Sequence, residues 1–369
     1  MTSLLRYSYI LLLLVVSLPT DAQTFDKSNA ETCEFKLSKA RALFEAGQLD
    51  KIPVLLGDCA SDKELSKSMR LSVLKLLTES YLFLNDMDKA NTIYQGILAI
   101  DPFFQPRTNV DHPELVYLSD KYVTTPTFSF GFKTGGNTTL VQTTKNYVFE
   151  DTVKSINESF ENNVTYHAGF FINYQIPKSR LELMLEVLYS NTDYNYTGMI
   201  DTKVDGETAQ LSFEETYTTL SFPISIKLNS PRNKPVKKPL SFYTYVGASL
   251  DILRTGRIEG VKLTIQRDNT IGSPGGLSGV DLISGNQTDM RNKTNFSIHC
   301  GLGVKYHIKR SQLFFDLRYS HTLKNIVNSE NRYSNQNLLR FWHVDNDLKW
   351  HTLYLSIGYR YSLYKVRRK

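Results

Sequence analysis

Apolar and polar residues alternate along residues 353–364, near the C-terminus of this chain. Successive side chains of a β-strand point to opposite faces, so this stretch has one apolar face and one small or polar face. The apolar face consists of Leu353, Leu355, Ile357, Tyr359, Tyr361 and Leu363. The opposite face consists of Tyr354, Ser356, Gly358, Arg360, Ser362 and Tyr364. The pattern predicts a β-strand whose two sides meet different surroundings.

The same alternation recurs along the C-terminal two thirds of the chain. The stretches are residues 127–135, 165–176, 180–189, 220–228, 240–253, 296–308, 313–319 and 353–364. Repeated apolar faces without an evident core to cover are typical of a closed barrel with lipid outside and a polar interior. We therefore predict an eight-stranded antiparallel transmembrane β-barrel over residues 125–369, in an outer membrane. The alternative is a soluble β-sandwich rich in aromatic residues.

The stretches between these strands differ in length. Short or moderate connections are expected at residues 177–179, 229–239 and 309–311. Long stretches rich in Asn, Thr, Ser and Gly lie near residues 136–163, 192–213, 255–293 and 322–349. Outer-membrane barrels have short periplasmic turns and long external loops. The pattern predicts surface loops at the long stretches and both chain termini in the periplasm. Pro223, inside a strand, predicts a local bulge because proline removes a ladder hydrogen bond.

Charged residues fall at inward positions of the predicted strands. Those on the periplasmic half are Glu182, Lys227, Lys305 and Arg360. Those on the external half are Lys133, Asp251, Asp316 and Arg318, with Glu186 between the two halves. Buried charges are tolerated when they are paired and hydrogen-bonded. An eight-stranded barrel is narrow enough for side chains to fill. We therefore expect a salt-bridged interior, with a narrow conducting channel as the alternative.

The N-terminus has the pattern of a secretory signal peptide. Arg6 precedes the apolar run at residues 10–18, and the small residue Ala22 precedes a cut before Gln23. The apolar run is too short for a stable membrane span. Residues 1–22 are therefore predicted to be removed on export, with an uncleaved anchor helix as the alternative.

Residues 23–124 are predicted to form a helical domain in the periplasm, which makes the chain an α+β multidomain protein. Helical spacing of apolar residues indicates helices at residues 33–48, 51–56, 65–85 and 88–100, with Asp88 as an N-cap, and one more near residues 112–122. The helix pairs resemble tetratricopeptide repeats at Phe44, Leu74, Leu77, Tyr81, Ala90, Tyr94 and Pro102. The resemblance implies a docking surface for a protein partner. A helical bundle without a binding role is the alternative.

Two of the three cysteines are placed so that they can pair. Cys33 begins the first predicted helix and Cys59 follows the second. These ends lie together in an antiparallel hairpin, and an oxidising periplasm permits a disulfide. We expect a Cys33–Cys59 bond rather than a metal site or a catalytic thiol.

Composition and charge limit the function classes. The chain has 369 residues, 12% aromatic residues and a formal net charge of +6. The tyrosines and phenylalanines suit the aromatic girdles of a membrane barrel. An exported chain without a nucleic-acid motif is not expected to bind DNA or RNA, and no cofactor motif is present. His343 and His351, with Asp345 and Asp347, are interpreted as a solvated loop, with metal binding as the alternative.

The motif LSFPISIKL at residues 220–228 and the glycine-rich aromatic strands resemble the PorT-like family of outer-membrane β-barrel proteins. The resemblance covers about residues 125–369. It implies a barrel linked to envelope processes, including type IX protein secretion, and carries no catalytic signature.

Three function hypotheses follow from the sequence. The first is a non-enzymatic barrel that sits in outer-membrane lipid and anchors a helical domain, residues 23–124. That domain would bind a periplasmic or outer-membrane protein of a machine for secretion, outer-membrane assembly or peptidoglycan linkage. The second is an enzyme acting on lipid or lipopolysaccharide, with candidates His167, His299, His321 and Ser320. The third is a narrow channel or ligand-binding porin.

Overall fold

The computed structural model describes residues 27–148, 153–203, 207–230, 240–267, 275–277 and 285–369. The predicted signal peptide, residues 1–22, lies outside these residues. The chain divides into two compact units, one of residues 1–124 with 366–369 and one of residues 125–365. The last four residues thus group with the helices, although the sequence analysis assigned them to the barrel. The reason is local packing, because Val366 contacts the apolar cluster around Tyr94 and the Lys369 N–H donates to the Lys121 carbonyl at 2.9 Å.

The helical unit contains five helices among the described residues. They are α2 (Lys27–Glu45), α3 (Lys51–Ser61), α4 (Lys67–Phe83), α5 (Met87–Ile100) and α6 (Pro113–Asp120). Asp86, not the predicted Asp88, caps α5, because its carboxylate accepts from the Lys89 N–H at 3.2 Å. Asn85 has a φ of 58°, the left-handed conformation that ends α4. None of the described helices is long and apolar enough to cross a membrane.

Two apolar clusters form the core of the helical unit. One lies among α2, α3 and α4 and includes Leu77 and both cysteines, with Phe44 and Tyr81 partly buried against it. The other surrounds Tyr94 on α5 and includes Leu74. Helices this short are marginal alone, so this burial is the main source of their stability.

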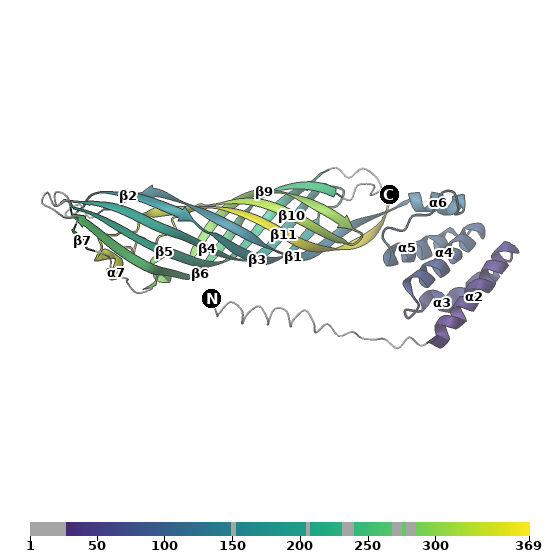
Figure 1. The fold of residues 1–369 in the computed structure, drawn as a ribbon. Helices are drawn as coiled ribbons and strands as arrows, with labels where there is room; N and C mark the ends of the chain where they lie inside the picture. Colours follow the sequence, from purple (N-terminus) through teal and green to yellow (C-terminus); the bar gives the residue numbers. More distant parts are fainter. Residues whose placement is uncertain (1–26, 149–152, 204–206, 231–239, 268–274, 278–284) are drawn as a thin grey trace. The chain divides into compact units, whose positions relative to one another are not determined.

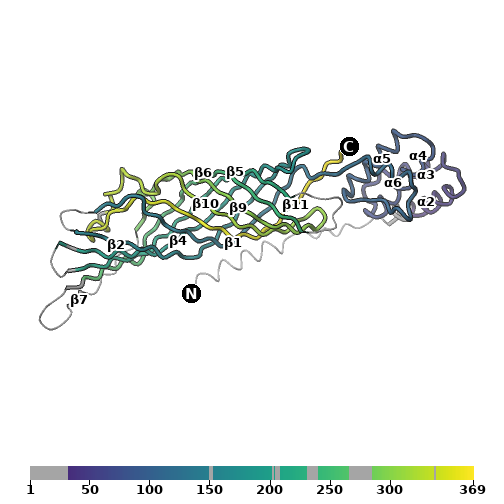
Figure 2. The backbone as a smooth tube through the Cα atoms, turned by 90° about the horizontal axis from the view of Figure 1, so that it is seen from above, coloured from purple at the N-terminus to yellow at the C-terminus, as the bar shows by residue number. Residues whose placement is uncertain are grey.

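Eight strands of the second unit form a closed ring (Figure 1). They are β1 (Tyr122–Lys145), β3 (Val164–Gln175), β4 (Leu181–Thr202), β5 (Glu207–Asn229), β6 (Leu240–Arg267), β9 (Thr294–Ile308), β10 (Ser311–Thr322) and β11 (Asp347–Arg368). They pair in the order β3, β1, β11, β10, β9, β6, β5, β4, and β4 pairs with β3 to close the ring. Figure 2 shows the near and far walls crossing obliquely, as tilted strands of a barrel do.

Three short strands complete the described sheet: β2 (Val153–Asn162), β7 (Gly275–Leu277) and β8 (Gly285–Asn286). β2 pairs with the far half of β4, whereas β7 and β8 pair with the far half of β6. They lie in the stretches that the sequence analysis expected to be loops.

The outer face of the barrel carries an apolar band. We use this term for the outward side chains of all eight strands at this level. They lie on β1 from residue 128 to 132, on β3 from 166 to 174, on β4 from 181 to 189, on β5 from 220 to 228, on β6 from 240 to 252, on β9 from 296 to 308, on β10 from 313 to 319 and on β11 from 353 to 363. Phe170 is 72% exposed, Leu302 56% and Ile357 59%, so protein does not cover these side chains. The outward positions of all eight predicted strands follow the expected alternation within this band.

The barrel wall continues well beyond the apolar band. Three of the four stretches expected to be external loops contain long pieces of β1, β4, β5 and β6, together with β2. We call this part, the described residues within 139–162, 191–219, 254–293 and 323–350, the extension. Most of its outward residues are polar, such as Asn191, Asp193 and Asn195 on β4, and exposed apolar residues such as Leu140 and Met199 are scattered. The hydropathy pattern that marks a membrane strand is therefore lost while the strand goes on. The loop prediction was therefore wrong over much of these stretches.

Pro223 occupies a regular strand position. Pro223 pairs with Ser249 of β6 without a change of register, which contradicts the predicted bulge. The pairing of β4 with β5 instead skips two positions, between Leu185 opposite Ile224 and Leu188 opposite Ser221, and keeps its register. The irregularities of β5 lie in the extension, between Ser212 and Glu214 and between Thr218 and Thr219. The wall thus tolerates the missing N–H as a local gap in the ladder.

Candidate functional site

Buried charges inside the barrel lie in layers. The turn-side layer, near the short connections, is centred on Glu182, which is 1% exposed. Its carboxylate is 2.7 Å from Arg360 Nη1 and 3.6 Å from Lys305 Nζ. Lys227 lies opposite Glu182 in register, and its Nζ is 4.4 Å from the centroid of the Tyr243 ring. The four residues predicted for this half therefore come together around one carboxylate, with cation–π contacts supplementing the ion pairs.

The central layer is built on Glu186. Lys133 Nζ lies 2.6 Å from one carboxylate oxygen, and Arg318 binds the other. Asp316 accepts hydrogen bonds from the hydroxyls of Tyr245 at 2.8 Å and Tyr243 at 3.1 Å. One carboxylate is thus paired with cations, and the other is satisfied by neutral donors.

Two glycines make room for these tyrosines. Gly301 and Gly303 of β9 face the rings of Tyr245 and Tyr243, and a Cβ at either position would overlap the ring. The glycine-rich strand is therefore a packing requirement of the central layer.

Asp251 does not join the ion-pair network that the sequence predicted. Its carboxylate accepts from the Ser249 hydroxyl at 2.7 Å and from the Ser297 hydroxyl. It lines a polar chamber between the central layer and the extension. The cavity volume of this chamber is about 50 Å³, enough for a few water molecules. Asp251 is separated from the cations because it lies farther along the barrel than Arg318.

A third charged layer, in the extension, was not predicted. Arg291 has a side chain that is 0% exposed, and its guanidinium lies 2.8 Å from Glu215 and 2.6 Å from Asp345. The Tyr217 hydroxyl accepts from Arg291 Nε at 2.6 Å and donates to Glu215 at 2.5 Å. The Tyr194 hydroxyl donates to the same carboxylate at 2.5 Å. We call these five residues the extension layer.

Electrostatics favours the charged forms in this layer. Burial alone would raise the pKa of Asp345, but Arg291 and the nearby imidazole of His343 hold that pKa well below its usual value. Burial likewise opposes the charge on Arg291, yet Asp345 and Glu215 keep the pKa of Arg291 well above the usual value. Asp345 and Arg291 therefore form an ion pair at neutral pH.

The interpretation of residues 343–351 as a solvated loop was wrong for most of its members. His343 is 4% exposed and Asp345 6% exposed, and His343 Nε2 lies 3.6 Å from Asp345. Asp347 binds Arg332, and His351 lies on the outer face of β11. Among the described residues, no three His, Cys, Asp or Glu side chains are grouped so that they could hold a metal ion. The sequence signal that could have revealed this core is the alternation of aromatic residues at Tyr194 and Tyr196 and at Phe213 and Tyr217, with Glu215 in phase between the last two.

Two of the three candidate catalytic histidines, His167 and His299, are buried inside the barrel. His167 Nε2 lies 2.9 Å from the Ser356 hydroxyl, and His299 Nε2 lies 2.7 Å from the Ser225 hydroxyl. Within the described part of the chain, neither imidazole has a hydrogen bond or ion pair with a carboxylate. Ser320 lines the chamber with His299, whereas His321 lies on the outer face. A Ser-His-acid triad needs a serine, a histidine and a carboxylate linked by hydrogen bonds, so His167 and His299 do not form one with these partners.

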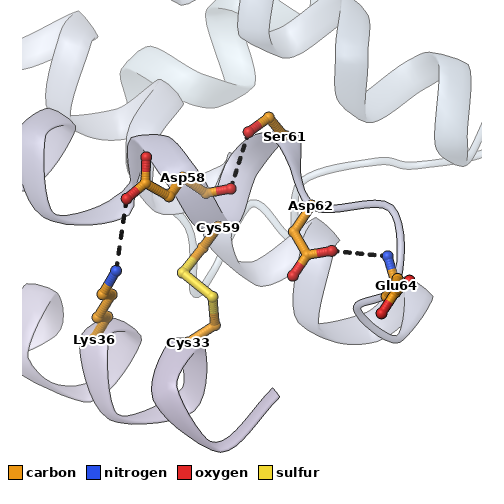
Figure 3. Close-up of a disulfide and its surroundings, with 7 residues drawn as sticks. All are labelled: Cys33, Lys36, Asp58, Cys59, Ser61, Asp62 and Glu64. Atoms are coloured by element: carbon orange, nitrogen blue, oxygen red, sulfur yellow. Dashed lines mark hydrogen bonds and ion pairs between the residues drawn. A yellow bond between two sulfur atoms is a disulfide. The ribbon is translucent and has the colours of Figure 1, made fainter. Parts of the chain in front are cut away.

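The predicted disulfide is present in the helical unit. Cys33 of α2 and Cys59 of α3 are bonded, with their Cα atoms 5.8 Å apart (Figure 3). Lys36 of α2 lies 3.8 Å from the Asp58 carboxylate beside it, as the dashed line in Figure 3 marks. The bond joins the two helices at the edge of the helical unit.

The other residues selected in the helical domain are mostly core residues. Ala90 is 0% exposed, and Pro102 is buried with its carbonyl accepting from the Thr124 hydroxyl at 2.5 Å. Phe44 instead lies at a partly exposed aromatic cluster, where its ring centroid is 5.7 Å from Phe83 and 5.5 Å from His112. Phe83 itself is 44% exposed. The helical unit therefore has both a packed interior and apolar groups at its surface.

A family model identifies the barrel. The model for the outer membrane protein beta-barrel domain matches residues 124–361, more than half of the chain. The chain belongs to this family. The match agrees with the closed ring of strands and the apolar band, and it assigns the protein to an outer membrane. The outer membrane protein beta-barrel domain thus covers nearly all of the second unit, and helices α2 to α6 precede it in the sequence.

Several solved outer-membrane proteins are similar to this chain in fold. Neisserial surface protein A is 13% identical, with 65% of this chain and 99% of that chain covered and a TM-score of 0.28. OprG from Pseudomonas aeruginosa is 11% identical, with 64% and 97% covered and a TM-score of 0.28. A major outer membrane protein from Thermus thermophilus is 11% identical, with 64% and 99% covered and a TM-score of 0.31. No curated protein matches the chain. The family assignment therefore rests on the family model.

Proposed function

We propose that the barrel is a non-enzymatic anchor that holds the helical domain in the periplasm, where this domain binds a protein of an envelope machine. The machine would serve secretion, outer-membrane assembly or peptidoglycan linkage. The observation that carries the proposal is the combination of a barrel filled by charged layers with a separate helical unit that exposes apolar side chains. The PorT-like and tetratricopeptide-like resemblances point to the same role.

The filled interior favours an anchor over a pore. The central layer and the extension layer each cross the interior with buried ion pairs, and the chamber between them has room for only a few water molecules. The proposal therefore predicts little or no ion conductance in planar bilayers. Steady single-channel currents from the purified protein would favour the channel hypothesis instead.

The histidines give little support for lipid chemistry. His167 and His299 each form a hydrogen bond with a serine but have no carboxylate partner among the described residues. The proposal predicts unchanged lipid A and phospholipid profiles in cells that lack the protein. A lost or added acyl group would favour the enzyme hypothesis.

The exposed side chains of the helices supply a direct test of the partner. Phe35 is 71% exposed, Val54 86% and Tyr117 66%, each on a different helix. The full-length protein would be expressed with a photoreactive amino acid at one of these positions. Irradiation of intact cells is expected to join it to a defined envelope protein. The matched control places the same group at Lys203, at the far end of β4, where that adduct should not form. Equal labelling from all positions, or no adduct from the helices, would contradict the proposal.

A further inference from the structure

A cluster of basic side chains lies on the outer face of the barrel, directly beyond the apolar band. His321 of β10 and His351 of β11 are opposite each other in register, with ring centroids 4.5 Å apart. The next outward pair toward the middle of the band is Tyr319 and Leu353, which are 42% and 44% exposed. The two imidazoles therefore occupy the first outward position past the apolar band on β10 and β11.

Two lysines extend this cluster along the edge of the band. Lys349 precedes His351 by two residues, so it lies on the same face of β11. Lys324 follows β10, and its Nζ lies 5.0 Å from the centroid of the Phe296 ring of β9. Phe296 is 44% exposed on the outer face. We call His321, Lys324, Lys349 and His351 the rim cluster. It lies at the ends of the neighbouring strands β10 and β11 and contacts Phe296 of β9.

The centre of the rim cluster is held in place by hydrogen bonds. The Tyr319 hydroxyl lies 2.5 Å from His351 Nδ1, and His351 Nε2 lies 2.8 Å from Gln142 Oε1 of β1. A hydroxyl that donates to Nδ1 leaves Nε2–H to donate to the glutamine oxygen, so one neutral tautomer satisfies both contacts. The two lysines are then the permanent positive charges of the cluster.

Basic charge is not general to the outer face of the extension. On the β4–β6 side, Glu214 lies directly opposite Glu259, and Asp193 is two positions from the Glu214 partner Asn195. The β4–β6 side of the wall therefore carries carboxylates together with exposed cations such as Arg257 and Lys262. The rim cluster, in contrast, consists of basic side chains only, so the outer face of the extension is not uniformly basic.

We propose that the rim cluster binds the phosphate of a lipid headgroup in the leaflet that borders the extension. Its position is continuous with the apolar band, so a lipid whose chains contact Leu353 and Tyr319 places its headgroup beside Lys324 and Lys349. Clustered lysines at a membrane surface attract anionic headgroups, and exposed aromatic rings at the same level suit the interface. The phosphate of an anionic headgroup can pair with both lysines. In a zwitterionic headgroup, the positive group of the lipid already neutralises the phosphate.

The test uses the full chain in detergent, titrated with phosphatidylglycerol or phosphatidylcholine, with bound lipid counted by native mass spectrometry. The parent protein is expected to bind phosphatidylglycerol in preference to phosphatidylcholine. The double variant Lys324→Gln/Lys349→Gln should lose about tenfold or more in affinity for phosphatidylglycerol. The matched double variant Lys203→Gln/Lys262→Gln removes the same charge from the extension and should bind as the parent does.

Three results would overturn the proposal. The first is unchanged phosphatidylglycerol affinity in the Lys324/Lys349 variant. The second is equal binding of the two lipids by the parent. The third is displacement of the lipid by inorganic phosphate at equal concentration, which would assign the site to a free anion. All four lysines are at the surface, so the variants are expected to fold, and heat-dependent gel mobility verifies this.

Discussion

The barrel has two regions that hold buried charges in the same way but differ in what surrounds them. In the apolar band, Glu186 is paired with Lys133 and Arg318 behind an outer face of apolar side chains. In the extension, Arg291 is paired with Glu215 and Asp345 behind an outer face of polar ones. The interiors are alike, whereas only the first region shows the alternation that marks a membrane strand. The outward residues therefore depend on whether lipid or water surrounds the wall, whereas the inward residues depend on the packing inside the barrel.

The largest effect is expected from the central layer. Glu186→Ala leaves Lys133 and Arg318 buried without their shared partner, which should cost about 3–5 kcal/mol in the free energy of unfolding. Urea unfolding in lipid vesicles, followed by tryptophan fluorescence, measures this loss. The control Glu161→Ala removes an exposed carboxylate of β2 and should change the free energy by less than about 0.5 kcal/mol. Similar losses in both variants would mean that the central layer is not a stabilising unit.

A smaller and more local effect is expected from the extension layer. Arg291→Met leaves Glu215 and Asp345 unpaired and should cost about 3 kcal/mol there. Because the layer lies beyond the apolar band, we expect faster proteolysis within residues 323–346 while the barrel keeps its gel mobility. Lys293→Met, which changes an exposed side chain nearby, serves as the control. Loss of the whole barrel in the Arg291 variant would show that the two regions unfold together.

Gly303→Ala tests the packing of the central layer. The added Cβ overlaps the Tyr243 ring, so the ring must move away from Asp316. Overpacking of this kind typically costs about 1–3 kcal/mol. The same unfolding assay measures it, with Gly260→Asn as a comparison at a site with a φ of 63° and open space around the Cβ. A neutral Gly303 variant would show that the tyrosine is free to shift.

Acid is expected to have the smallest effect, because it removes one of the two carboxylates that bind Arg291. The folded pKa of Asp345 is depressed, so its contribution is complete above the usual value of 3.8 and is lost as the pH falls below it. The rate of proteolysis within residues 323–346 should therefore rise below about pH 4. The rate should return to its neutral value when the protein is neutralised before the protease is added. Asp345→Asn should be cleaved faster at neutral pH and show a weaker acid response. An unchanged acid response in this variant would assign the effect to another group.

The sequence could predict the apolar band because lipid imposes a strict rule on outward residues. Each strand there alternates, and the inward charges Glu182, Glu186 and Arg318 could be identified from their phase alone. The extension obeys no such rule, because water accepts any outward residue. Its strands and its Arg291 layer were therefore taken for loops. The partners of Asp251 were missed for a different reason. The alternation along a strand shows which side chains point inward, but not how far apart two inward side chains of different strands lie along the barrel.

A spin-label scan of β4 tests the central claim that one continuous strand passes from lipid into water. Labels would be placed at outward positions 185, 187, 189, 191, 193 and 195 in a Cys300→Ser background, with the protein in lipid vesicles. We predict that oxygen relaxes the labels at 185–189 more than a water-soluble nickel complex does. We predict the reverse at 191–195, with restricted label motion throughout. Equal access of the nickel complex at every position, or freely mobile labels at 191–195, would contradict the account.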